Sequence, residues 1–69
     1  MSDDAIHSAE AQVAKAKAEL DKAQDDLNRR QQLSATGAIS KEELSTAQAA
    51  LNNAQAGYNL AQAGWAQAK

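Results

Sequence analysis

The sequence predicts an all-α fold, an antiparallel two-helix coiled-coil hairpin with a short turn around Gly37. Three observations predict it. Apolar residues recur every seven positions in each half, the only glycine before position 57 lies near the middle of the chain, and a helix-capping sequence follows that glycine. The composition agrees, because 18 of the 69 residues are Ala, eight are Gln and none is Pro, a balance that favours helix.

Each half of the chain carries a heptad pattern, with a large apolar residue followed, in all but one heptad, by Ala three residues later. These are the a and d positions of a coiled coil, which we call the seam. A β-strand would need strict alternation instead. The large seam residues are Ile6, Val13, Leu20 and Leu27 in the first half and Leu44, Leu51, Tyr58 and Trp65 in the second.

The residues between the halves predict where the helices end. Gly37 suits the position just after a helix C-terminus, where φ is positive. Residues 40–43, Ser-Lys-Glu-Glu, have the form of a capping box, with Ser40 as the N-cap and Glu43 three residues later. We therefore expect helix one over about 3–36, with Ser2 as its cap, a turn over about 36–40, and helix two over about 41–68.

The seam also predicts a register. One alignment of the helices sets every large residue opposite an Ala, so that Leu27 faces Ala47; the rival alignment sets Leu opposite Leu. We prefer the first, because alternating large and small residues fill space at native density and allow close helix approach. It also brings both chain ends to one level, which suggests a hairpin excised from a larger protein.

Composition excludes several classes of function. There is no Cys and only one His, so a disulfide or a Cys/His metal cluster is not expected. A net charge of −2 offers no surface for nucleic acid. No apolar run could cross a membrane, and the acidic N-terminus does not resemble a signal peptide. A two-helix hairpin has no concave pocket, so neither an enzyme nor a bound cofactor is expected.

Charges concentrate on the first helix. The four-residue spacing there predicts the ion pairs Asp25–Arg29 and Asp26–Arg30. The second helix has no charged residue after Glu43 until the last position, and its only glycines are Gly57 and Gly64. This neutral face either lets a neighbouring hairpin pack closely or is a tolerant surface without a role, and the sequence leaves both interpretations open.

The tip of the hairpin, residues 29–40, differs from the arms. Leu33 and Ile39 flank the turn where the seam ends, and Arg30 occupies a seam position that elsewhere is Ala. In one interpretation, Leu33 and Ile39 pack on each other and Ser40 only caps helix two. In the other, the tip is an exposed apolar and basic surface that docks onto a partner.

Residues 26–44, Asp-Leu-Asn-Arg-Arg-Gln-Gln-Leu-Ser-Ala-Thr-Gly-Ala-Ile-Ser-Lys-Glu-Glu-Leu, resemble the hairpin tip of periplasmic adaptor proteins, the membrane fusion proteins of the HlyD/AcrA/EmrA family. The tip motif of that family is Arg, three residues, Leu, six residues and Ser. Arg29, Leu33 and Ser40 match it at full spacing. The double Arg and the Gly-Ala-Ile-Ser turn look most like the EmrA branch.

The resemblance implies the coiled-coil hairpin of a tripartite multidrug efflux or type I secretion adaptor, located in the periplasm in a parent protein anchored to the inner membrane. The tip would dock onto a TolC-like outer-membrane channel through Arg29, Leu33 and Ser40, supported by Arg30, Gly37 and Ile39. Neighbouring adaptor hairpins would pack along the arms, and an inner-membrane transporter would bind through domains outside this chain. The alternative is a structural or oligomerisation coiled-coil spacer without a tip partner.

Overall fold

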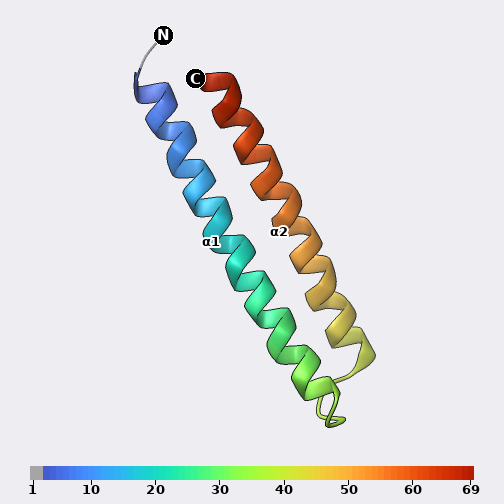
Figure 1. The fold of residues 1–69 in the computed structure, drawn as a ribbon. Coiled ribbons are helices and arrows are strands. Elements are labelled where there is room, and N and C mark those ends of the chain that lie inside the picture. Colours follow the sequence, from blue (N-terminus) through green and yellow to red (C-terminus); the bar gives the residue numbers. More distant parts are fainter. Residues whose placement is uncertain (1–2) are drawn as a thin grey trace.

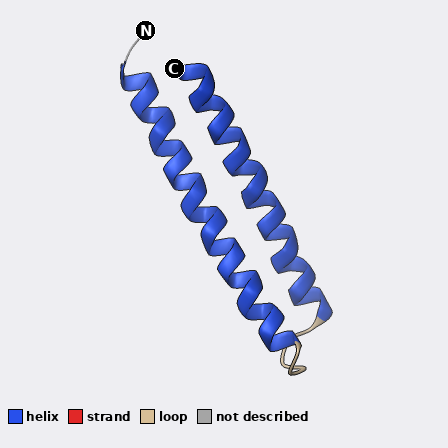
Figure 2. Cartoon of the chain, viewed as in Figure 1, coloured by secondary structure: helices blue, strands red, loops and turns tan. Residues whose placement is uncertain are grey.

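The computed structural model describes residues 3–69 as two antiparallel helices joined by a short turn. Helix α1 spans Asp3–Ser34 and helix α2 spans Lys41–Ala68. Figure 1 shows the helices side by side along their length, with the start of α1 and the end of α2 at one end and the turn at the other. The described residues form only helix and loop (Figure 2), so the predicted all-α hairpin is confirmed. The predicted cap Ser2 lies outside the described residues.

The two helices pack along a thin seam. Its most buried residues are Leu27 and Ala47, each 4% exposed, which are a pair that the preferred register sets opposite one another. The other large seam residues are half-buried, because each helix has a single neighbour to cover it. A core of this size leaves a two-helix hairpin marginally stable.

The turn stabilises the C-terminus of α1 in the way that the position of Gly37 predicts. The N–H of Gly37 donates to the Ser34 carbonyl at 3.0 Å and the N–H of Ala38 donates to the Leu33 carbonyl at 3.1 Å. With Gly37 at φ 80, these two bonds form a Schellman motif. Helix α1 ends at Ser34 rather than near Thr36 because the Thr36 N–H bonds three residues back, to the Leu33 carbonyl at 3.1 Å.

Two glycine substitutions should change the stability of this fold in opposite directions. Gly37→Ala should cost about 1 kcal/mol, because the positive φ is strained for Ala although an added Cβ meets nothing within 4 Å. Gly57→Ala should stabilise the monomer by roughly 0.5–1 kcal/mol, because Gly57 lies within an ordinary helix. Urea denaturation of dilute protein, followed by circular dichroism, measures both. Shifts in the same direction would contradict this account of the turn.

One face of the hairpin is covered by side chains that bond to each other, and we call it the amide face. Gln31 of α1 and Gln48 of α2 line one groove, which shows that these helix flanks share a face. Along these flanks the side chains pair at four-residue spacing, at distances of 2.7–3.2 Å. The pairs are Lys17–Asp21, Gln24–Asn28, Gln48–Asn52 and Gln55–Asn59.

Each Gln–Asn pair on the amide face adds a few tenths of a kcal/mol to its helix. The hydrogen bond from Lys17 to Asp21, with the attraction between their charges, raises the pKa of Lys17 above its ordinary value of 10.5. Because folding raises the pKa of Lys17, the stabilisation from the Lys17–Asp21 pair is complete below the ordinary pKa of lysine. It is lost as the pH rises through the higher value. The pair is therefore intact at neutral pH.

Candidate docking site at the hairpin tip

The turn gathers the motif residues Arg29, Leu33 and Ser40 at the end of the hairpin farthest from the termini (Figure 1). Arg29 and Leu33 lie on the last turns of α1, and Ser40 is the residue before α2. The two apolar residues of the tip differ in burial. Ile39 is half-buried, whereas Leu33 remains 45% exposed. The end of the hairpin therefore leaves an accessible apolar side chain beside a basic one.

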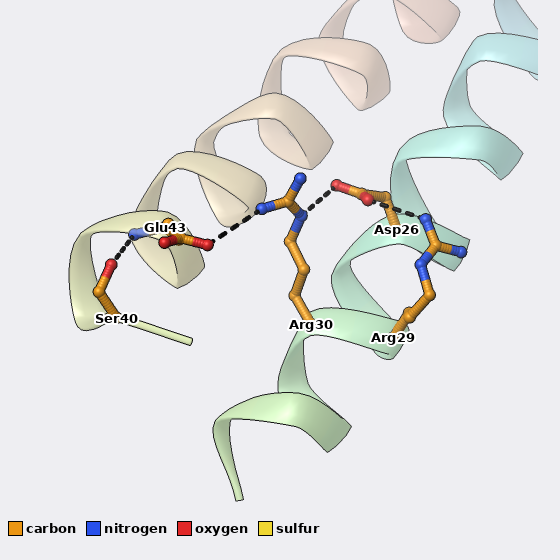
Figure 3. Close-up of polar contacts among 5 residues, drawn as sticks. All are labelled: Asp26, Arg29, Arg30, Ser40 and Glu43. Atoms are coloured by element: carbon orange, nitrogen blue, oxygen red, sulfur yellow. Dashed lines mark hydrogen bonds and ion pairs between the residues drawn. The ribbon is translucent and has the colours of Figure 1, made fainter. Parts of the chain in front are cut away.

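One carboxylate holds both arginines of the tip. Arg29 Nη2 donates to Asp26 Oδ1 at 3.0 Å, and Arg30 Nε donates to Asp26 Oδ2 at 2.9 Å (Figure 3). The predicted Asp26–Arg30 pair is present. The spacing had predicted that Arg29 would pair with Asp25, but Arg29 pairs with Asp26 instead. Asp26 has two oxygens that can accept from two guanidinium groups at once, so it positions Arg29 relative to Arg30.

Arg30 connects the two helices. Its Nη1 lies 3.8 Å from Glu43 Oε2 of α2, and Figure 3 shows the guanidinium between the carboxylates of Asp26 and Glu43. The break in the heptad pattern at position 30 is thus the site of an ion pair between helices. At side-chain exposures of 37% and 58%, such a pair contributes less than about 1 kcal/mol. Arg29, at 64%, is the more exposed arginine.

Ser40 is the N-cap of α2, as predicted. Its backbone is extended, at φ −78 and ψ 161, and its Oγ accepts from the Glu43 N–H at 3.1 Å. Only this half of the capping box forms, because the carboxylate of Glu43 points toward Arg30 (Figure 3). Ser40 is itself exposed, so its hydroxyl caps the helix at the surface of the tip.

The surface next to the tip is hollowed. A hollow of about 360 Å³ lies there, between the helices, and is lined in part by Asp26, Arg30, Ser40 and Glu43. Within residues 3–69, no group of three or more His, Cys, Asp or Glu side chains could hold a metal ion. Neither described helix is long and apolar enough to cross a membrane.

The structure gives Asp26 a second partner and adds Leu60, which sequence reasoning did not single out. Asp26 had been assigned one arginine, and its contact with the second depends on side-chain conformations that spacing does not reveal. Leu60 is the most exposed of the large apolar residues in the described chain, at 74%. The signal that would have revealed Leu60 is its place outside the seam in an arm without charges.

Comparison with known proteins identifies the family. The family model described as "RND MFP, alpha-helical hairpin domain" matches residues 5–69. Fatty acid resistance protein FarA of Neisseria gonorrhoeae is 52% identical over 46 residues, which cover 67% of this chain and 12% of that protein. No solved structure was found to match. Because the family model spans nearly the whole chain, the chain belongs to the α-helical hairpin domain family of the RND membrane fusion proteins.

Proposed function

We propose that this hairpin docks the adaptor of a tripartite multidrug efflux or type I secretion system onto a TolC-like outer-membrane channel. The family supports an efflux adaptor hairpin. The observation that supports docking is the exposure of Leu33 at the end of the hairpin. Apolar side chains together with Arg are enriched in the contact surfaces of proteins, and the tip exposes one of each.

Each residue of the tip motif has a distinct part in this proposal. Leu33 supplies the apolar side chain that enters a groove on the channel, and such central anchors carry most of the binding energy of an interface. Arg29 has five N–H donors and uses one side-chain nitrogen on Asp26, so it can also bind acceptors on the channel. Arg30 and Gly37 hold the tip in shape, through the ion pair with Glu43 and through the turn.

The rest of the proposal concerns the parent protein, of which this chain matches a small part. The hairpin would stand in the periplasm, with neighbouring adaptor hairpins along its arms and an inner-membrane transporter bound to other domains. The double Arg at 29–30 and the Gly-Ala-Ile-Ser turn at 37–40 support the EmrA branch of the family. In this proposal the hairpin carries out no catalytic step and binds no cofactor.

The competing function is a structural spacer without a tip partner. Two observations favour it. Ser40 and Arg30 both have partners within the hairpin, so neither residue needs a partner protein to account for its place in the sequence. Capture of the outer-membrane channel by the full-length adaptor separates the two functions. Only docking concentrates the sensitivity to substitution at residues 29–40, whereas a spacer would be sensitive along its seam.

Ser40→Asp tests whether Ser40 docks as well as caps. Asp is as good an N-cap as Ser, so the helix content of the hairpin should be unchanged. The added charge should impair efflux by the full-length adaptor, which is measured as drug susceptibility of cells. Ser40→Ala should cost about 1 kcal/mol of stability because it removes the cap.

Ser45→Asp is the matched control for this experiment. It adds the same charge to an exposed position one turn into α2, away from the tip motif, and should leave efflux unchanged. If efflux by the Ser40→Asp adaptor is normal, Ser40 acts only as the cap of α2 and does not take part in docking.

A further inference from the structure

Glu43 has two possible partners near the start of α2, and the structure uses only one of them. In a complete capping box, its carboxylate would accept from the N–H of Ser40. Instead, Glu43 Oε2 lies 3.8 Å from Arg30 Nη1 of α1 (Figure 3). Within the described residues, no group accepts from the Ser40 N–H. The capping box therefore keeps one free donor while its carboxylate is engaged across the helices.

The contact between Arg30 and Glu43 is a loose one. At 3.8 Å it is longer than a hydrogen bond, and water screens charges on side chains that are 37% and 58% exposed. The competing contact, from the Ser40 N–H to the same carboxylate, would be a hydrogen bond to a charged acceptor within one helix turn. Both contacts contribute modestly to stability, so a rotation of the Glu43 side chain exchanges two arrangements that are close in free energy.

Arg30 stays in place when Glu43 leaves it. Its Nε donates to Asp26 Oδ2 at 2.9 Å, and this bond fixes the direction of the guanidinium. The remaining N–H donors of the side chain are on its two Nη atoms. Arg30 lines the hollow of about 360 Å³ beside the tip. Release by Glu43 thus leaves an oriented guanidinium with free donors at the surface next to the tip.

The charges around the hollow indicate which partner group suits these donors. Three carboxylates line it, those of Asp26, Glu42 and Glu43, against the single cation of Arg30. A further carboxylate would be repelled by this excess of negative charge. Neutral oxygen acceptors, such as carbonyl groups, bind a guanidinium without that repulsion. The arrangement therefore favours neutral oxygen atoms of a partner over acidic side chains.

We propose that docking exchanges the partners of Glu43. Neutral oxygen acceptors on the channel bind Arg30, and the carboxylate of Glu43 turns back to the Ser40 N–H. The new hydrogen bond offsets the lost ion pair, so Arg30 becomes available to the channel as a second arginine beside Arg29. The start of α2 is completed only in the docked tip. This inference rests on the proposed docking function and adds Arg30 and Glu43 to the residues that decide its strength.

Exchange of the Ser40 amide proton with solvent, measured by NMR on this chain, tests the competition for Glu43. Arg30→Ala removes the charge that holds the carboxylate, so the Ser40 N–H should gain an acceptor and exchange several-fold more slowly. Arg29→Ala is the matched control, because Arg29 pairs with Asp26, and it should leave the exchange rate unchanged. Equal exchange rates in the parent and Arg30→Ala chains would overturn the inference.

Capture of the purified outer-membrane channel by the full-length adaptor tests the docked state. Glu43→Gln no longer holds Arg30 by charge, but Gln still completes a capping box, so capture should strengthen several-fold. Arg30→Ala should weaken capture several-fold, and in that background Glu43→Gln should have no effect. Glu42→Gln is the matched control, because it removes a neighbouring carboxylate of the same hollow, and it should leave capture unchanged.

Two results of the capture experiment would overturn the exchange. One is an equal gain from Glu42→Gln, which would reduce the effect to net charge, and the other is a gain from Glu43→Gln that persists without Arg30. The loss caused by Arg30→Ala should be the same at low and high salt, and a loss that shrinks at high salt would overturn the neutral acceptor.

The tip variant Leu33→Asp separates this inference from the proposed function. If Leu33→Asp abolishes capture while Glu43→Gln leaves it unchanged, the exchange of partners is wrong and docking stands. If Leu33→Asp leaves capture intact, the docking function is wrong, whatever the exchange rate of the Ser40 amide.

Discussion

Leu33→Asp should abolish binding of the full-length adaptor to its outer-membrane channel while the hairpin keeps its helix content. Leu33 is 45% exposed, so the fold loses little when the side chain is replaced. In the docked state, however, the carboxylate would have to leave water for an apolar groove, which costs several kcal/mol. Because every 1.4 kcal/mol changes affinity tenfold, we expect a loss of roughly 100-fold or more in binding.

The measurement is crosslinking of the adaptor to the channel in cells, with circular dichroism of the isolated hairpin as the test of folding. Gln62→Asp is the matched control, because it adds the same charge to an exposed position far from the tip, and it should retain the crosslink. Leu33→Ala, which removes the apolar side chain without adding a charge, should give an intermediate loss. If the Leu33→Asp adaptor crosslinks as strongly as the parent protein, the docking function is wrong.

Leu27→Ala should unfold most of the isolated hairpin at low concentration. Leu27 is one of the two most buried residues, at 4% exposed, and truncation of a buried Leu to Ala typically costs 2–5 kcal/mol. A hairpin of this size has only about 3–5 kcal/mol of stability from its core, so the loss is comparable with the whole. The helical signal at 222 nm should fall accordingly.

Leu60→Ala is the control for Leu27→Ala, because it makes the same chemical change in the same kind of helix at an exposed position. It should alter stability by less than about 0.5 kcal/mol in the dilute monomer. The pair thus separates burial from helix propensity. Equal effects of the two substitutions would show that Leu27 is not in the core.

Thermal melts of the parent hairpin should be measured over a range of concentrations. Marginal stability and self-association predict a low melting temperature that rises with concentration. A cooperative melt above about 70 °C that does not depend on concentration would exceed the ordinary mesophilic range. It would show that the single seam is more stabilising than its burial indicates.

The sequence by itself determined the features that depend on residues close together in the chain. Heptad spacing determined the two helices and their seam, because residues three, four and seven apart share one side of a helix. Gly37 determined the turn, because a positive φ favours glycine. Ser40 determined the start of α2, because its side chain reaches the N–H of Glu43 three residues later.

Only the tertiary structure decided which side chains find partners between the helices and which remain exposed. It turned Glu43 toward Arg30 on the other helix and left half of the capping box unformed. At the tip it half-buried Ile39 and left Leu33 accessible, although both are large apolar residues beside the same turn. Sequence spacing could not decide these outcomes, because they depend on side-chain conformations and on distances across two helices that meet only in the folded hairpin.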